Sequence, residues 1–430
     1  MRVLIFEPGF GGHRLTTARR LIQALKALPV DVVVATSPAA PESVEWSVQL
    51  HQQLSEVVVD PSVRIVSGTP LQWAWSSLRA LQAAWRQHQV DHIIVPVADG
   101  IAQFHGISNS LGIFRPPPGV EIEGLMMRGG FGYPESVHRR GEVMRRASAI
   151  AALRAPWTSL HHLDPFSASY LLHQSDSMLG HKLPRVVQMP DAVEVPVMDS
   201  CQARRVLGLP EEGRYLVCAG GLSPRKGVDK LIRAFAVAPL GASDRLLLAG
   251  RASPEIRAIL DSESVELVAQ NRIICIDRYL SENEFAAALG AANLVVTPYP
   301  DHLASASIVI AAAAAKRPVL GSDKGWIGRI VPFFDLGWTS LVSESRVFGE
   351  AIRMALDAAK DYCATEMTRR FVAFHTVQNM RLTWTQRIRE RLGIATGTMN
   401  CSWDWVVTGH SSSVSMSVPQ DLNNKAQTCP

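Results

Sequence analysis

Short apolar runs alternate with amphipathic stretches along most of the chain, with the spacing of buried strands and one-sided helices. In the first half, strands are predicted at Arg2–Phe6, Val30–Ala35, Asp91–Val97 and Val120–Leu125, and helices at Leu15–Leu25, Leu71–Arg86 and Ser136–Ala147. In the second half, strands are predicted at Tyr215–Ala219, Arg245–Ala249, Arg272–Ile276, Asn293–Thr297 and Arg317–Leu320. Strands that alternate with helices indicate parallel sheets covered by helices, so the pattern predicts two doubly wound α/β domains.

The alternation is interrupted between the two halves by a less regular stretch that ends in the proline-punctuated segment around Met189-Pro190-Asp191. The domain boundary is therefore predicted near residues 188–200. Residues 1–187 form the first predicted domain and 188–370 the second, and a helix is expected within 371–394. The segment 395–430 is rich in Ser, Thr and Asn and poor in charge, which predicts a largely disordered tail.

The composition of the chain excludes some classes of protein. A chain of 430 residues exceeds what one hydrophobic core usually supports. With 47% hydrophobic residues, 19% charged residues and a net charge of +4, the chain is mildly basic and lacks the dense Lys/Arg clusters of a nucleic-acid-binding protein. Six scattered cysteines without CxxC spacing, and no stretch of membrane-spanning length, predict a cytoplasmic protein with reduced thiols; peripheral contact with a membrane stays open.

The segment Arg214–Phe235 combines a buried strand, a glycine turn, a basic pair and an amphipathic helix. Gly220 and Gly221 permit a sharp exit from the strand, and Arg225 and Lys226 are expected where the helix begins. Backbone N–H groups and the positive end of the helix dipole point to that place, so the segment predicts a pyrophosphate site. The same residues are also compatible with an ordinary solvated turn.

Several such motifs follow one another in the order found in retaining glycosyltransferases of the GT-B fold, and the chain resembles the large family 4 of that class. The matching segments are the glycine loop Gly9-Phe10-Gly11-Gly12-His13, the linker Met189–Glu194, the phosphate loop Gly220–Gly227, and the stretch from Ser281 to Leu320. The resemblance covers roughly residues 1–390, which is more specific than any single motif.

The resemblance implies two Rossmann-like domains that face a central cleft. A nucleotide diphosphate sugar would lie across the second domain, a glycan or lipid-linked acceptor would approach from the first, and the helix in 371–394 would pack back on the first domain. In that family the leaving phosphate can itself take the acceptor proton, so no protein nucleophile is required. No metal and no cofactor besides the donor are expected. Polysaccharide biosynthesis is the process that the family suggests.

The chain departs from the family at the donor site. The family's two glutamates, eight positions apart, correspond to Leu303 and Ala311, and its usual phosphate-loop arginine corresponds to Gly221. Lys226 is kept. The loop before the following helix is rich in serine instead, and Ser305 is predicted as the N-cap of that helix, with Ser307 beside it as a phosphate contact.

The remaining candidates are single residues in the expected loops. His13, Gly11 and Gly12 follow the first strand, where they could contact the acceptor or a donor phosphate, and Asp99 follows a later strand, where it could orient an acceptor hydroxyl. His302, in the donor loop, could reach the sugar. A metal site at His161-His162 and Asp164 is disfavoured, because no third ligand appears at helix or hairpin spacing.

Three other kinds of function share features with this sequence. A dinucleotide-dependent dehydrogenase is disfavoured, because Arg14 occupies the third glycine position and no acidic residue ends the second strand. A non-catalytic subunit with a glycosyltransferase-like fold stays open because of Leu303, Ala311 and Gly221. Epimerases and phosphorylases of the GT-B architecture also stay open, since only product analysis separates them from transferases.

Overall fold

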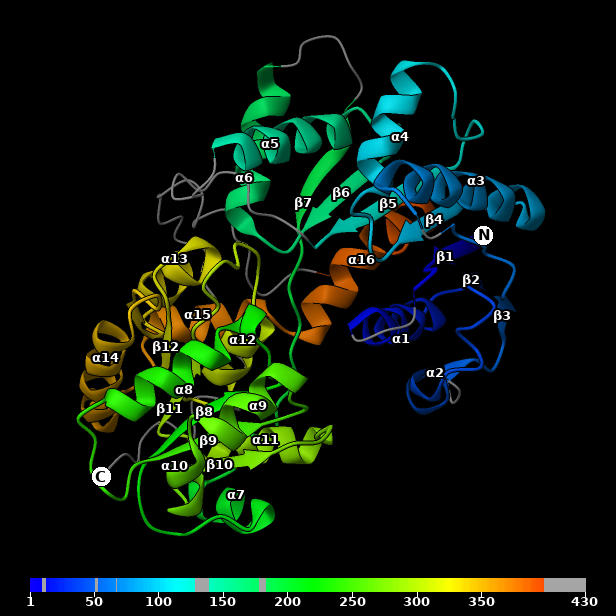
Figure 1. The fold of residues 1–430 in the computed structure, drawn as a ribbon. Helices are drawn as coiled ribbons and strands as arrows, with labels where there is room; N and C mark the ends of the chain where they lie inside the picture. The colour runs from blue at the N-terminus through cyan, green and yellow to red at the C-terminus, as the bar shows by residue number, and fades with distance from the viewer. Residues whose placement is uncertain (10–12, 51–52, 67, 128–138, 178–182, 398–430) are drawn as a thin grey trace. The chain divides into compact units, whose positions relative to one another are not determined.

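The computed structural model divides the chain into two compact units, each with its own parallel sheet (Figure 1). It describes residues 1–9, 13–50, 53–66, 68–127, 139–177 and 183–397. The first unit comprises Met1–Pro190 and Val377–Pro430, and the second comprises Asp191–Thr376. The chain therefore leaves the first unit, builds the whole second unit, and returns to the first at Val377.

The first unit contains a seven-stranded parallel sheet with the order β3-β2-β1-β4-β5-β6-β7 in the described residues. Its strands are β1 (Arg2–Phe6), β2 (Asp31–Ala35), β3 (Val57–Asp60), β4 (His92–Val95), β5 (Glu121–Met126), β6 (Ser159–His162) and β7 (Arg185–Gln188). Its helices are α1 (His13–Lys26), α2 (Val44–Gln49), α3 (Pro70–His88), α4 (Ile101–Ser110), α5 (Arg139–Leu153), α6 (Pro165–Ser177) and α16 (Val377–Leu392).

Helices cover both faces of this sheet. α3, α4, α5 and α6 are neighbours in that order on one side, while α16 packs beside α1 on the other (Figure 1). The core lies between the sheet and the first group and is built from apolar side chains of both, including Leu81 and Trp85 of α3. Trp384 of α16 is fully buried as well, so the last helix is part of this unit's interior.

The second unit contains a six-stranded parallel sheet with the order β10-β9-β8-β11-β12-β13. Its strands are β8 (Tyr215–Ala219), β9 (Arg245–Ala249), β10 (Ile273–Ile276), β11 (Leu294–Thr297), β12 (Val319–Ser322) and β13 (Gly337–Ser340). Its helices are α7 (Ser200–Leu207), α8 (Val228–Val237), α9 (Pro254–Ser262), α10 (Val265–Ala269), α11 (Glu282–Ala291), α12 (Ser307–Ala314), α13 (Gly325–Phe333), α14 (Ser345–Ala358) and α15 (Glu366–Phe374), with 3-10 turns η2 (Pro224–Lys226) and η3 (Ala359–Asp361).

The predicted α/β class with two parallel sheets is confirmed, and every strand predicted from the sequence is present within a few residues. The stretch described as less regular before residue 188 was misjudged, because it contains β6 and β7. Strands β3 and β13, at edges of the two sheets, were also missed. No helix in the described residues combines the length and hydrophobicity needed to cross a bilayer.

Candidate phosphate-binding site

The loop after β8 is shaped by two glycines in the left-handed region. Gly220 has φ of 100° and turns the chain out of the sheet, and Gly227 has φ of 72° and caps the start of α8. Between them, Arg225 and Lys226 lie in the 3-10 turn η2, directly before the N-cap of α8. This turn directs the loop back over the end of β8, because Lys226 N–H donates to the Ser223 carbonyl at 3.0 Å.

Lys226 is a half-buried cation without an anionic partner in the part of the chain that the structure describes. Its Nζ lies 3.0 Å from the place where a Cβ on Gly220 would be, so the side chain folds back onto the glycine turn. It makes no salt bridge or hydrogen bond through Nζ within the described part of the chain. Burial lowers the pKa of Lys226, and the positive charge of Arg225 lowers it further, whereas Cys218 opposes the shift. A charge held in this way gains most from an anion that enters the loop.

Tyr299 supports Lys226 and was not identified from the sequence. Its ring centroid lies 5.6 Å from Lys226 Nζ, within cation–π range. Its N–H donates to the Lys226 carbonyl at 3.1 Å, and its backbone has φ of 26°, an uncommon conformation for a residue with a side chain. The only sequence signal was the Pro-Tyr-Pro turn directly after β11. The loops after β8 and β11 are therefore joined at the basic pair.

The loop between β11 and α12 brings His302 and Ser305 together. His302 Nε2 lies 3.1 Å from the Ser305 carbonyl oxygen, so Nε2 carries the proton and Nδ1 is left as an acceptor. Burial lowers the pKa of His302, which keeps the ring neutral. Ser305 is not the N-cap of α12, as had been predicted: the N-cap is Ala306, and Ser305 Oγ instead donates to Asp191 Oδ2 at 3.1 Å. Ser307 is the first residue of the helix.

The two positions that correspond to the family's glutamates hold apolar side chains in this loop and helix. Ala311 lies on the inward face of α12 with 1% of its surface exposed, and Leu303 is half-buried. Leu303 and His302 also crowd the first residue of α13, where a Cβ on Gly325 would lie 2.8 Å from Leu303 Cα. The described donor loop therefore offers serine hydroxyls, backbone N–H groups and basic side chains, but no carboxylate at these two positions.

The predicted residues of the first unit lie after β1 and β4. Asp99 Oδ2 accepts a hydrogen bond from Met127 N–H at 2.9 Å, which ties the loop after β4 to the end of β5. His13 is the first residue of α1. Gly11 and Gly12 lie outside the described residues.

Glu7 is a second residue that the sequence did not single out. It follows β1, is 2% exposed, and its Oε1 accepts from Gly9 N–H at 2.9 Å and from Arg14 at 2.7 Å. Arg14 thus braces the glycine loop at the position where a dehydrogenase would have its third glycine. Burial raises the pKa of Glu7, although Arg14 opposes this shift.

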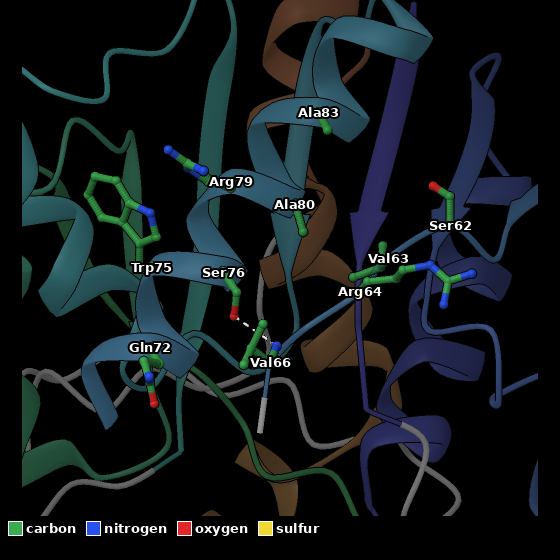
Figure 2. A pocket seen from close by; sticks show the side chains of 10 residues that line it. All are labelled: Ser62, Val63, Arg64, Val66, Gln72, Trp75, Ser76, Arg79, Ala80 and Ala83. Carbon is green, nitrogen blue, oxygen red and sulfur yellow. Dashed lines mark hydrogen bonds between the residues drawn. The ribbon is translucent and has the colours of Figure 1, made fainter. Parts of the chain in front are cut away.

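Figure 2 shows a pocket of about 570 Å³ in the first unit, between the segment after β3 and one face of α3. Its lining comprises Ser62, Val63, Arg64, Val66, Gln72, Trp75, Ser76, Arg79, Ala80 and Ala83. Arg79 lies over the ring of Trp75 at 5.2 Å and points away from Arg64, so the two guanidinium groups do not converge on one anion. None of the predicted donor or acceptor residues lines this pocket.

Comparison with known proteins gives a fold but no close relative. No protein-family model and no curated protein sequence matches the chain. Among solved structures, sucrose-phosphate synthase from Thermosynechococcus elongatus matches with a TM-score of 0.65 at 18% identity, over 91% of this chain and 99% of the other. The chain has the GT-B fold.

Two further structures agree with this assignment. HepE of Anabaena, solved in complex with UDP-glucose, matches with a TM-score of 0.60 at 14% identity, over 91% of this chain and 99% of HepE. WaaG, a glycosyltransferase involved in lipopolysaccharide biosynthesis, matches with a TM-score of 0.57 at 15% identity, over 91% and 99% of the two chains. At such identities the likeness establishes the GT-B fold alone.

Proposed function

We propose that this GT-B protein is a glycosyltransferase that moves a sugar from a nucleotide diphosphate sugar to a glycan or lipid-linked acceptor, with retention of configuration. The observation that carries the proposal is the ammonium of Lys226, which has no anionic partner among the described residues and lies beside the glycine turn after β8. In open parallel sheets, ligands bind beyond the carboxyl ends of the strands, which is where this loop lies. The UDP-glucose complex of HepE supports a nucleotide sugar as the ligand class.

The same loop supplies what departure of a nucleoside diphosphate requires. Negative charge grows on the leaving phosphate as the glycosidic bond breaks, and preorganised cations and N–H donors lower the energy of that state. Lys226 and Arg225 are the cations. The amide of Gly221 has no acceptor within the described residues and is a donor of the right kind, as are the first N–H groups of α12 at Ser307.

The remaining roles follow from the loops that hold each residue. His302 presents an unprotonated Nδ1 in the donor loop and is assigned to a sugar hydroxyl. His13, with Gly11 and Gly12, and Asp99 are assigned to the acceptor side in the first unit. By analogy with retaining enzymes of this fold, the β-phosphate oxygen of the donor accepts the proton of the acceptor hydroxyl, so no metal and no protein nucleophile takes part in the transfer.

A non-catalytic role is the second candidate, and Leu303 and Ala311 favour it. Loss of one good hydrogen bond to a donor hydroxyl costs about 1–3 kcal/mol, so loss of two weakens donor binding strongly unless other contacts compensate. A protein of this kind would bind a nucleotide or a partner without turnover.

The first experiment measures thermal stability against UDP-, GDP-, ADP- and TDP-sugars, with the natural protein, Lys226→Ala and a matched control, Lys230→Ala, in the adjacent helix α8. A ligand at 100 times its dissociation constant adds about 2.7 kcal/mol to the free energy of unfolding. We expect one nucleotide class to raise the melting temperature of the natural protein and of Lys230→Ala, but not of Lys226→Ala. An equal shift in both lysine variants would remove Lys226 from the site.

Product analysis with the nucleotide identified in this way then separates the candidate activities. A retaining transferase gives a glycoside with the anomeric configuration of the donor and releases the nucleoside diphosphate. An epimerase changes the donor sugar without an acceptor. Binding with no product, when supplied with membrane and glycan extracts as acceptor sources, favours the non-catalytic candidate.

A further inference from the structure

A compact group of ionisable side chains lies in the first unit, away from the loops discussed so far. It consists of His92, the first residue of β4, with Glu121 and Glu123 near the start of β5. One ligand atom from each of the three lies within 4.8 Å of the other two. β4 and β5 are neighbours in the parallel sheet, with His92 paired to Glu121 in the register, so adjacent backbones hold the three side chains together.

The outer oxygen of each carboxylate is held by a basic side chain. Glu123 Oε2 accepts a hydrogen bond from His161 Nε2 of β6 at 2.7 Å. Glu121 Oε1 accepts from Arg387 of α16 at 2.8 Å. These contacts orient both carboxylates in the way that second-shell partners orient metal ligands.

Other polar atoms of the three side chains lie close to one another. His92 Nε2 lies 3.0 Å from Glu123 Oε1, and His92 Nδ1 lies 3.8 Å from Glu121 Oε2. None of these four atoms has a hydrogen bond of acceptable geometry within the described residues, although all are buried. Ligands on one zinc ion, at bond lengths near 2.1 Å, stand about 3.4 Å apart. His92 offers one ring nitrogen to a single ion, and the 3.0 Å between its Nε2 and Glu123 Oε1 is close to that separation.

Burial makes polar atoms without a hydrogen-bond partner costly in this cluster. His92 and Glu123 are each 0% exposed. Ser159, which pairs with Glu123 across β5 and β6, adds another buried oxygen without a partner among the described residues. Unsatisfied polar atoms in such number are rare in a folded interior.

We propose that His92, Glu121 and Glu123 bind one divalent transition-metal ion of the Zn²⁺ type, with a structural role. One imidazole and two carboxylates form a donor set that suits zinc, and an additional ligand is supplied by water. The site lies at the amino ends of the strands, so it has no part in sugar transfer. This inference does not depend on the proposed function.

The ion fastens α16 to the sheet. Arg387 of α16 holds the outer oxygen of Glu121, and Trp384 of α16 packs its ring 4.7 Å from that of His161, which in turn holds Glu123. Two contacts of the last helix therefore rest on side chains that the ion would order. No metal was expected from the family resemblance. His92 and the two glutamates are far apart along the chain, and only the sheet register brings them together.

The test measures zinc binding to the tag-free, full-length chain in which Cys201, Cys363, Cys401 and Cys429 are replaced by serine to remove adventitious thiol ligands. Metal-stripped protein is titrated with Zn²⁺ in competition with a chromophoric chelator. We expect one equivalent of tight binding and a rise in melting temperature. In His92→Gln and Glu123→Gln the affinity should fall on the order of 100-fold or more. His173→Gln, which changes an exposed histidine of the same unit, should bind like the parent.

A spectroscopic measurement separates a metal site from a proton-bridged cluster. Co²⁺ in place of Zn²⁺ should give visible absorption bands of a low-symmetry nitrogen and oxygen site in the parent, and these bands should be absent in His92→Gln. Should the variants of the two buried residues fail to fold, Glu121→Gln provides the same comparison at the more exposed carboxylate. Absence of tight Zn²⁺ binding in the folded parent, or equal affinity in all variants, would overturn the proposal. The cluster would then be held together by a proton on His92 that is shared with the glutamates.

Discussion

At the scale of single residues, the charge that suits Lys226 to bind a phosphate also lowers the stability of the second unit. Lys226 is charged, half-buried and without an anion in the described residues, so the folded chain bears a desolvation cost that a bound phosphate would remove. Tyr299 offsets part of this cost through its ring at 5.6 Å. Functional residues of this kind are expected to destabilise the unliganded protein.

Replacing Lys226 with methionine should therefore stabilise the protein while abolishing nucleotide binding. We expect Lys226→Met to raise the free energy of unfolding by about 1 kcal/mol at neutral pH, within the usual range of single substitutions. Chemical denaturation gives this value, and Lys230→Met on α8 serves as the control. A loss of stability in Lys226→Met would mean that the ammonium has a partner in the folded protein.

The advantage of Lys226→Met should depend on pH in a defined direction. Because burial lowers the pKa of Lys226, the unfolded chain binds more protons than the folded one between the lowered value and the ordinary value near 10.5. The free energy of unfolding of the natural protein therefore rises with pH in that window. The difference in free energy of unfolding between Lys226→Met and the natural protein should become smaller there. A gap that widens with pH would show that the folded pKa is raised instead.

At the scale of elements, the site depends on contact between the loops after β8 and β11. A Cβ on Gly227 would lie 2.9 Å from Pro300 Cδ and 3.1 Å from Pro298 Cβ, in addition to the strain of φ at 72°. Gly208, which ends α7, has φ of 64° but nothing within 4 Å of its Cβ position. Alanine at either position would therefore bear the strain of a positive φ. Alanine at Gly227 would in addition crowd the atoms of Pro298 and Pro300.

Alanine substitution at the two glycines should separate these effects. Gly208→Ala is expected to cost about 1 kcal/mol of unfolding free energy from strain alone. Gly227→Ala should cost more, and it should also reduce the nucleotide-induced rise in melting temperature because the proline loop must move away from Lys226. Equal costs, with an unchanged response to nucleotide, would show that the loop contact has no influence on the site.

Sequence periodicity predicted the central strands well and failed at strands that carry polar side chains or lie at sheet edges. β6 reads Ser-Leu-His-His and is buried throughout, and its histidine His161 is hydrogen-bonded to Glu123 of the neighbouring strand β5. β13 reads Gly-Trp-Thr-Ser and begins with Gly337 at φ of 139°, so it shows little apolar periodicity. Such strands are specified by their neighbours rather than by their own residues.

The same limit applies to the candidate site. Lys226 and the glycine turn were predictable because strand, turn and helix are contiguous in the sequence. Tyr299 lies more than seventy residues farther along and meets Lys226 only because β8 and β11 are adjacent in the sheet. The register of the sheet, which local periodicity does not encode, brings these residues together.

At the scale of the whole molecule, the second unit is a continuous insertion into the first. Asp191 N–H donates to His375 Nδ1 at 3.1 Å, and Val193 N–H donates to the His375 carbonyl at 3.4 Å. The outgoing and returning segments therefore run side by side at the boundary. His375 is buried there, and burial lowers its pKa to about 3, so its ring stays neutral at physiological pH.

This connectivity predicts how the chain can be divided. The fragment 191–376 has its own sheet and core and should unfold cooperatively by itself, with a nucleotide response that Lys226→Ala removes. The fragment 1–190 lacks α16 and should be unstable, because Trp384 and Ile388, both 0% exposed in the whole chain, no longer cover the sheet. Burying two large apolar side chains contributes about 3–6 kcal/mol, a large part of the stability of a typical domain.

Adding α16 back to the fragment 1–190 is the control for this prediction. Because the two crossing segments lie side by side, a short Gly/Ser linker from Pro190 to Val377, followed by residues up to 397, should return the helix to its place. Circular dichroism melts of 1–190 with and without this addition measure the difference, and Trp384→Ala in the linked form should lose most of it. Equal stability of all three would mean that the helices within residues 1–190 are enough to hold the sheet of the first unit, and that the last helix is a surface addition.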